Sequence, residues 1–172
     1  MIDGAAWILG DNVSTDEILP GRYMGLTDLA ALGRHALEGV VPGLPARIAP
    51  GDVLVGGRNF GTGSSREQAP VALREAGFGA IVAASFARIF FRNCLNVGLP
   101  VLWSPTAAAE AREGDRLLID PASGTIRNVT RGTEHVVPPL PAFAQAIVAG
   151  GGLMPYARAR LGRTLVPRAG ES

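Results

Sequence analysis

Two serines and an arginine, Ser64, Ser65 and Arg66, follow two closely spaced glycines, Gly61 and Gly63. Serine hydroxyls can donate hydrogen bonds to an anion, and a guanidinium can pair with a carboxylate or phosphate in two places. Glycine permits a positive φ and lets the backbone come close to a ligand. These residue types in this order therefore predict a binding site for a carboxylate or a bare phosphate.

The residues on either side predict a strand, a loop and a helix. The short apolar run at 52–56 is typical of a buried strand, and apolar residues recur at helical spacing over 67–76. Ser64 or Ser65 is the predicted helix N-cap, and Pro70 fits the first turn, where no N–H is needed. The polar side chains would then lie where free N–H groups and the helix dipole favour an anion.

A capped helix without a ligand is the simpler interpretation of this loop, although a plain turn needs only one capping side chain. The sequence contains no lysine. This absence excludes a nucleotide P-loop, which uses a lysine on the phosphates, and it also excludes Schiff-base chemistry.

The composition is that of a globular protein, with 47% hydrophobic and 18% charged residues in 172. The length predicts one domain with a sizeable core, which we place at residues 1–160. A net charge of +1 gives no general attraction to nucleic acid, and no apolar run approaches the roughly 20 residues that span a bilayer. One cysteine, Cys94, and an N-terminus unlike a signal peptide predict a cytoplasmic protein without an intrachain disulfide.

The rest of the sequence predicts an α/β fold with a parallel α/β layer and an antiparallel β portion. The parallel layer contains strands at 5–9, 52–56, 79–84 and 98–103 and helices at 28–37, 67–76 and 85–96. The antiparallel portion contains strands at 115–120, 125–129 and 133–137. A closing helix is predicted at 141–148 and a loose tail at 161–172.

Three acidic residues near the N-terminus, Asp11, Asp16 and Glu17, lack the alternating spacing of a calcium loop. We expect them to form turns or contacts between elements rather than a metal site. His35 and His135 are predicted to have surface or packing roles.

Two arginines, Arg88 and Arg92, lie one helical turn apart in an otherwise apolar segment. Because an unpaired buried charge is very costly, we expect structural ion pairs there, with ligand contact as the alternative.

Three motifs in order resemble a known family: GDNVSTDEILP at 10–20, NFGTGSSREQ at 59–68 and SFARIFFRNCLNVG at 85–98. Together they resemble the small subunit of 3-isopropylmalate dehydratase, which is similar to the swivelling domain of aconitase. The resemblance extends from about residue 3 to about residue 160.

This resemblance implies a swivelling β/β/α domain that closes over a large subunit carrying a [4Fe-4S] cluster, in a heterodimer or heterotetramer. It implies a hydro-lyase reaction on a small organic acid in leucine biosynthesis, with no cofactor bound by this chain. Ser64 would be the base that removes the carbon-bound proton, and Ser65 and Arg66 would hold a substrate carboxylate. Gly61, Thr62 and Gly63 would form the loop, with Thr62 at a position where the family often has cysteine.

The resemblance also places Tyr23, Met24, Gly25 and Leu26 where related enzymes distinguish their substrates. The absence of arginine there argues against a second distal carboxylate, as in homoaconitate, because that group needs a charge partner. Met24 and Leu26 suit a branched apolar group, which favours isopropylmalate and also admits citraconate, 2-methylmalate or 2,3-dimethylmalate. A related dehydratase, such as homoaconitase, and a non-catalytic module for small carboxylates remain the alternatives.

Overall fold

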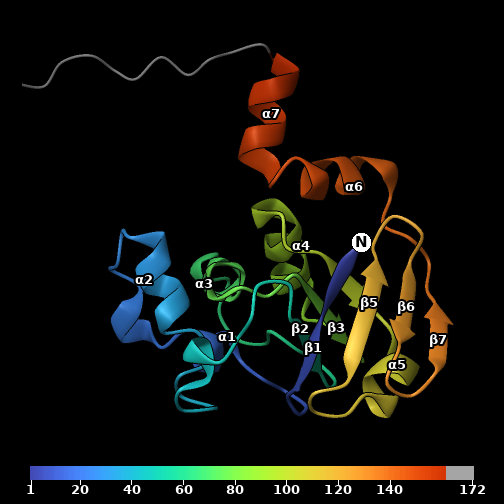
Figure 1. Ribbon diagram of the computed structural model, residues 1–172. Helices are drawn as coiled ribbons and strands as arrows, with labels where there is room; N and C mark the ends of the chain where they lie inside the picture. Colours follow the sequence, from blue (N-terminus) through green and yellow to red (C-terminus); the bar gives the residue numbers. More distant parts are fainter. Residues whose placement is uncertain (162–172) are drawn as a thin grey trace, which may run out of the picture.

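One mixed sheet of seven strands forms the centre of the computed structural model, which describes residues 1–161 (Figure 1). The strand order is β4-β3-β2-β1-β5-β6-β7. Strands β1 to β4 are parallel, while β5, β6 and β7 continue the sheet from β1 in antiparallel pairing. The strands are β1 Ile2–Ile8, β2 Val53–Gly56, β3 Ala80–Ala83, β4 Val101–Trp103, β5 Arg116–Asp120, β6 Thr125–Asn128 and β7 Thr133–Val136. The predicted α/β class with a parallel layer and an antiparallel portion is confirmed.

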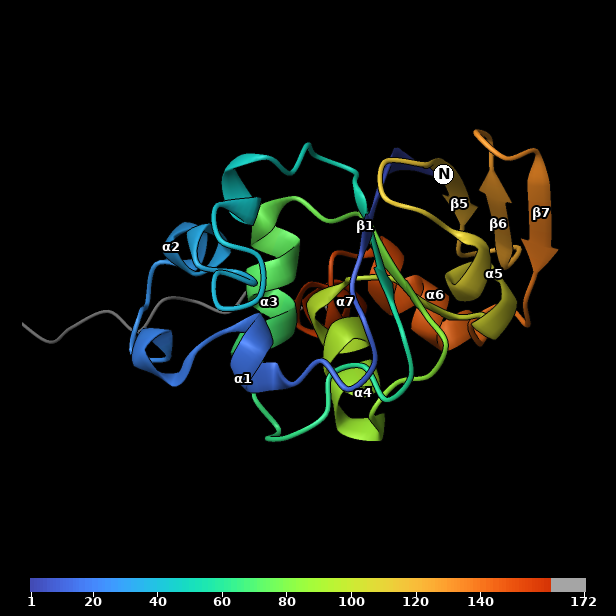
Figure 2. The same cartoon turned by 90° about the horizontal axis from the view of Figure 1, so that it is seen from below.

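Helices lie on both faces of this sheet, most of them on one face. They are α1 Thr15–Ile18, α2 Leu29–Arg34, α3 Gln68–Ala76, α4 Arg88–Val97, α5 Pro105–Glu110, α6 Ala142–Ala149 and α7 Leu153–Leu161. Two 3-10 turns, Gly21–Tyr23 and Leu44–Ala46, complete the long connection from β1 to β2. Helices α1, α2, α3 and α4 lie on one side of β1 to β4, whereas α5 packs against β3 and β7 (Figure 2).

Alternating side chains of the parallel strands serve two separate cores. In β2, Leu54 belongs to the core beneath α1 to α4, while Val53 and Val55 belong to the core that includes residues of α5. All three side chains are at most 1% exposed. A continuous apolar run is what a strand covered on both faces requires, and this explains the composition of β2 and β3.

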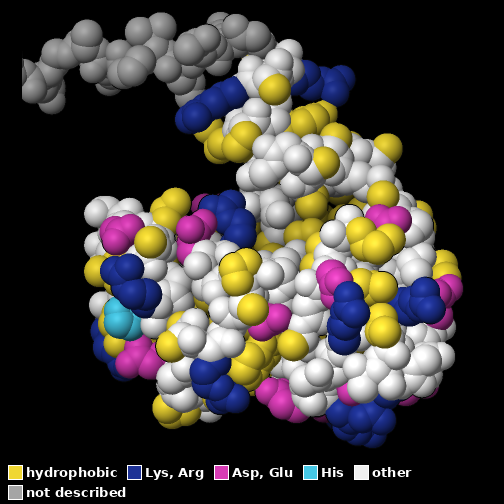
Figure 3. Space-filling view, viewed as in Figure 1, with side chains coloured by type: hydrophobic (Ala, Val, Ile, Leu, Met, Phe, Trp, Pro, Cys, Tyr) yellow, Lys and Arg dark blue, Asp and Glu magenta, His cyan; other side chains and the backbone are white. Residues whose placement is uncertain are grey.

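Helices α6 and α7 project from the body of the molecule and expose hydrophobic side chains (Figure 3). Phe143, Met154 and Leu161 are each more than half exposed. In the described part of the chain, no helix is long and apolar enough to cross a membrane.

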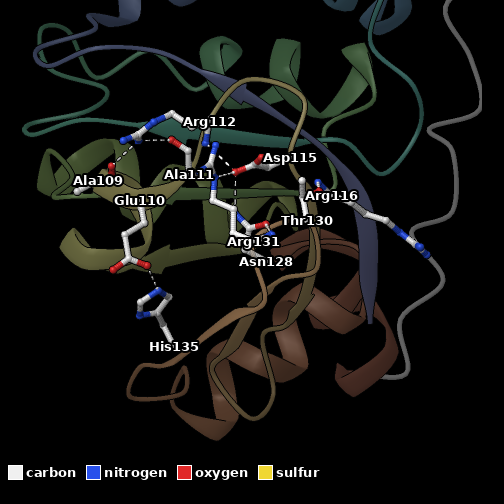
Figure 4. A network of polar contacts seen from close by, with 10 residues as sticks. All are labelled: Ala109, Glu110, Ala111, Arg112, Asp115, Arg116, Asn128, Thr130, Arg131 and His135. Atoms are coloured by element: carbon white, nitrogen blue, oxygen red, sulfur yellow. Dashed lines mark hydrogen bonds and ion pairs between the residues drawn. The ribbon is translucent and has the colours of Figure 1, made fainter.

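A polar network around Asp115 fixes the antiparallel half of the sheet (Figure 4). Its carboxylate accepts hydrogen bonds from the Asn128 amide at 2.8 Å, the Arg131 guanidinium at 2.6 Å and the Arg112 backbone N–H at 2.9 Å. Burial acts to raise the pKa of Asp115, but these three donors outweigh it and hold the pKa below its ordinary value.

The same figure shows the His135 ring bonded to Glu110 of α5 at 2.9 Å, which connects β7 with that helix (Figure 4). His35 similarly meets Glu38 at 2.9 Å and stacks on Tyr23. The predicted packing roles of both histidines are confirmed.

Several predicted boundaries were wrong because tertiary contacts end the elements. Helix α2 stops at Arg34 rather than 37, where the Leu37 N–H donates to the Ile18 carbonyl and Leu37 takes a positive φ of 59°. Helix α4 starts at Arg88 rather than 85, because Phe86 forms a parallel β-bridge with Phe60.

Helices α1, α5 and α7 and both 3-10 turns were not predicted from the sequence. Helix α5 carries a readable signal, since Ser104 caps it and Pro105 occupies its first turn. Helix α7 covers 153–161, so Leu161 of the predicted tail is helical, and the remainder of that prediction, 162–172, lies outside the described residues.

Candidate functional site

The predicted serines and arginine lie together at an open depression of about 690 Å³. Ser64 and Ser65 are exposed, so both hydroxyls are accessible. The lining residues come from three segments that are distant in sequence: Met24, the run Ser64–Gln68, and Ile89 and Asn93 of α4. The depression therefore joins the second and third motifs to the loop that follows the first motif.

Ser64 is held by a residue that sequence reasoning missed. The Thr15 hydroxyl lies 3.2 Å from Ser64 Oγ and donates to the Ser64 carbonyl at 3.1 Å. Thr15 itself is 1% exposed and stands at the start of α1, where Ser14 and Glu17 form a capping box. That box was readable in the sequence as S-x-x-E, and it places a fixed hydroxyl beneath the serine.

The loop ahead of Ser64 is attached to the same segment through its backbone. The Thr15 N–H donates to the Thr62 carbonyl at 2.8 Å, and the Gly61 N–H donates to Val13 at 2.8 Å. Thr62 also forms a parallel β-bridge with Ser14. These bonds hold the backbone at Thr62 beside the segment that carries Thr15.

Gly61 and Gly63 are both required by this geometry. Gly61 has φ of 78°, and a Cβ there would overlap the Phe90 ring. Gly63 has φ of 99°, and a Cβ there would come within 3.3 Å of the Thr15 hydroxyl. The predicted use of both glycines for positive φ is confirmed.

The predicted N-cap was wrong. Helix α3 begins at Gln68, and the residue at its N-cap is Glu67, which makes no side-chain capping bond. The bonds from Thr15 to Ser64 and from the Asn93 amide to the Ser65 carbonyl, at 3.3 Å, hold both serines outside the helix. Pro70 lies in the first turn, as predicted.

As a consequence, the approach to α3 presents free donors. Within residues 1–161, no backbone N–H from Ser64 to Gln68 donates to another protein group. Exposed backbone N–H groups at the positive end of a helix dipole form a favourable position for an anion. The chain therefore provides hydroxyl and amide donors at the same depression.

Arg66 provides the guanidinium of the site. Its side chain is 18% exposed, pairs with Asp16 and donates to the Leu19 carbonyl at 3.3 Å. These bonds fix the orientation of the guanidinium at the edge of the depression. The Asp16 contact also confirms the predicted role of the N-terminal acidic residues, as do Asp11, which bonds to Arg58, and Glu17 in the capping box.

The four predicted specificity residues separate into two groups. Met24 lines the depression and is 37% exposed. Tyr23 instead stacks on His35 with ring centroids 3.8 Å apart, which anchors the loop to the residues after α2. Gly25 and Leu26 lie outside the lining, and a Cβ at Gly25 would meet nothing within 4 Å.

The predicted ion pairs of Arg88 and Arg92 were wrong. Both side chains are exposed, and neither pairs with a carboxylate among residues 1–161. The prediction assumed a buried helix, whereas α4 buries Phe90, Asn93 and Cys94 on one side only. The guanidinium groups therefore carry no desolvation cost that would require a partner within the fold.

The residues that the structure describes do not fit an iron-sulfur cluster. Across residues 1–161, no three His, Cys, Asp or Glu side chains are grouped to hold a metal ion. Cys94 is fully buried, and burial raises the pKa of its thiol, which disfavours the thiolate that binds iron.

Comparison with known proteins first relates the fold and the site to the aconitase C-terminal domain and to a dehydratase of known structure. Residues 47–105, which contain the glycine loop, α3 and α4, match the aconitase C-terminal domain family. The crystal structure of 3-isopropylmalate dehydratase (leuD) from Methanocaldococcus jannaschii superposes with a TM-score of 0.87 at 39% identity, covering 93% of this chain and 95% of that one.

Curated relatives then define the family. The 3-isopropylmalate dehydratase small subunit of Moorella thermoacetica is 49% identical over 156 residues, covering 91% of this chain and 94% of the relative. That of Thermodesulfovibrio yellowstonii is 44% identical over 160 residues, covering 93% and 95%. The methanogen homoaconitase small subunit of Methanothermobacter thermautotrophicus is 49% identical over 154 residues, covering 90% and 89%. The chain belongs to the 3-isopropylmalate dehydratase small-subunit family.

Proposed function

We propose that this chain is the small subunit of a hydro-lyase that interconverts 2-isopropylmalate and 3-isopropylmalate in leucine biosynthesis by dehydration and rehydration. The observation that carries the proposal is the exposed Ser64 hydroxyl, 3.2 Å from the buried Thr15 hydroxyl at the open depression. Family membership supports the reaction class, because the relatives from Moorella thermoacetica and Thermodesulfovibrio yellowstonii are named 3-isopropylmalate dehydratase small subunits.

Ser64 is the base in this proposal. Its ionised oxygen takes the carbon-bound proton, the C–H electron pair becomes the second bond of the alkene, and the substrate hydroxyl leaves the adjacent carbon. In rehydration, the hydroxyl of a water adds to the carbon that lost the proton, and a proton is delivered to the carbon that lost the hydroxyl. Expulsion of hydroxide calls for a Lewis acid, which a [4Fe-4S] cluster on the large subunit supplies.

Ser65 and Arg66 hold a substrate carboxylate next to Ser64. The Ser65 hydroxyl is exposed, while its carbonyl is fixed by the Asn93 amide at 3.3 Å. Arg66 is already oriented by Asp16 and Leu19, so a carboxylate meets a guanidinium whose geometry is set before binding. The free N–H groups ahead of α3 add donors to the same anion.

The substrate side chain faces Met24 in this arrangement. Within the predicted specificity segment, 23–26, Met24 alone lines the depression, and the segment contains no cation. An apolar isopropyl group suits the methionine, whereas the distal carboxylate of homocitrate would lack a charge partner there. Homocitrate is the second candidate substrate, because one relative is named a homoaconitase small subunit.

The test uses this chain assembled with its large subunit. Ser64→Ala should lower kcat roughly 100-fold or more, the usual contribution of a positioned acid-base group. Ser65→Ala is the matched neighbour and should act mainly by raising KM. Unchanged turnover in the Ser64 variant, with carboxylate binding retained, would support a binding module instead.

Three further measurements define the complex. The purified chain alone should show no dehydratase activity, and turnover without a second subunit would contradict the proposed division of labour. Turnover of 2-isopropylmalate, homocitrate and 2-methylmalate by the complex identifies the substrate, with 2-isopropylmalate preferred. Mass measurement of the complex distinguishes a heterodimer from a heterotetramer.

A further inference from the structure

A second hollow lies on the side of α4 away from the serine site. It has a volume of about 330 Å³ and is lined by Ser85, Phe86, Arg88, Phe91, Arg92 and Trp103. Trp103 is 64% exposed, yet its indole N–H donates to the Ala84 carbonyl at 2.7 Å, so the ring is held in place. Phe86 and Phe91 meet edge to face with centroids 5.7 Å apart, which fixes the aromatic wall of the hollow.

The two arginines of this hollow are unfavourably placed within the isolated chain. Arg88 is the first residue of α4, where the helix dipole opposes a cation, and Arg92 lies at i+4, where like charges repel. Neither pairs with a carboxylate anywhere in the described residues. A carboxylate placed between them from another molecule would remove both penalties.

The hollow continues as a groove. A neighbouring hollow of about 460 Å³ shares Phe91 and Trp103 with it and extends to the proline-rich segment 138–141. Arginine and tryptophan are the residue types that most often contribute binding energy at protein interfaces. The chemistry therefore suits a protein segment with an acidic residue at one end and apolar side chains along the groove.

Helix α4 also connects this groove to the serine site. Ile89, which is 54% exposed, and Asn93 line the depression of Ser64, while Arg88, Phe91 and Arg92 line the groove. A chain that covers the depression must therefore approach the same helix. A second copy of this chain is the less suitable occupant, because a twofold contact at this groove would bring identical pairs of arginines together.

We propose that this groove is a docking surface for the large subunit, which inserts a carboxylate between Arg88 and Arg92 and an apolar side chain against Trp103. The inference rests on the proposed function only in that a large subunit is the partner. It assigns α4 two roles, since one side supports Ser65 and the other receives the partner.

The test measures binding of the full chain to the large subunit and the turnover of the complex. The double variant Arg88→Glu with Arg92→Glu should raise the dissociation constant roughly 30-fold or more, as charge pairs at other interfaces do when they are broken. Arg127→Glu is the matched control, because Arg127 is an exposed arginine of β6 without an ion pair in the described part of the chain. Thermal unfolding of each variant confirms that it folds.

Trp103→Ala should weaken binding independently of salt, whereas the effect of the arginine variants should shrink as ionic strength rises. Unchanged affinity in the double arginine variant, with normal turnover of isopropylmalate, would overturn the docking surface and leave the proposed function intact. A wild-type chain that binds no large subunit would overturn both. Self-association that the double variant abolishes would assign the groove to a second copy instead.

Discussion

Removing the Thr15 hydroxyl tests whether its contacts with Ser64 hold that serine in position. Thr15→Val keeps the branched side chain at a site that is 1% exposed, and it deletes the contacts at 3.2 Å and 3.1 Å to Ser64. A hydrogen bond contributes a net of about 0.5–1.5 kcal/mol, so the two contacts together stabilise the observed orientation of Ser64 by roughly 1–3 kcal/mol. If the transition state depends on that orientation, kcat falls roughly 10- to 100-fold.

The assay is steady-state turnover of 2-isopropylmalate by the complex, with thermal unfolding of the same variant. We expect kcat to fall while KM changes by less than about threefold, since Thr15 acts on the base and not on the carboxylate holders. Thr15→Ser retains the hydroxyl and should recover most of kcat. Stability should decrease by roughly 1–3 kcal/mol, at about 2–4 °C in Tm per kcal/mol for a chain of this size.

Two results would refute this reasoning. A valine variant with wild-type kcat would show that the hydroxyl contact has no role in positioning Ser64. A serine variant as impaired as the valine variant would show that Thr15 acts through packing of its methyl group, which is a structural role.

Three further changes test other features of the chain. Gly61→Ala places a side chain at a φ of 78° and against the Phe90 ring, so unfolding experiments should show a loss of at least about 2 kcal/mol. Gly25→Arg has open space for its Cβ and should raise the kcat/KM of homocitrate relative to 2-isopropylmalate; an unchanged ratio would contradict our placement of this loop. The pKa of Asp115 is depressed on folding, so its stabilisation is present above its ordinary pKa of 3.8 and is lost as pH falls through the folded value. Asp115→Asn should therefore be less stable than the wild type at pH 7, and the difference measured by denaturant unfolding should shrink on acidification; a pH-independent difference would contradict this assignment.

Local sequence patterns sufficed for the core elements that position the site. The apolar run of β2, the two glycines and the helical spacing after Glu67 each reflect short-range physics, so strand, loop and helix occur where they were predicted. Likewise, the change from continuous apolar runs to short alternating strands marks the change from parallel to antiparallel pairing.

Contacts between distant residues decided what the sequence alone could not. The serines were predicted as caps because a serine before a helix usually caps it, but Thr15 and Asn93, from two other elements, hold this segment away from α3. No local pattern in the loop records these partners. The sequence pattern that could have indicated Thr15 is the capping box formed by Ser14 and Glu17, which predicts a helix start in the first motif.

The apolar pattern around Arg88 and Arg92 also led to a wrong prediction of their burial. Arg88 and Arg92 were predicted to need internal partners because their neighbours are apolar, yet Ile89 beside them is 54% exposed. An apolar residue on a helix can face the core or a binding surface, and the pattern is the same in both cases. The structure separates the two cases by showing which side of α4 carries the buried residues, Phe90 and Cys94.

In the proposed mechanism, the energetics of Ser64 divide its positioning and its activation between two chains. An alcohol is about as weak an acid as water, so forming an alkoxide at pH 7 costs roughly 12 kcal/mol. The start of α3 contributes at most about 2 kcal/mol, and the charge of Arg66 is partly offset by Asp16. Because Ser64 is exposed in this chain, water also screens these groups. A partner that covers the depression would exclude that water and strengthen the same donors, so docking against α4 would itself be a step in activating the serine.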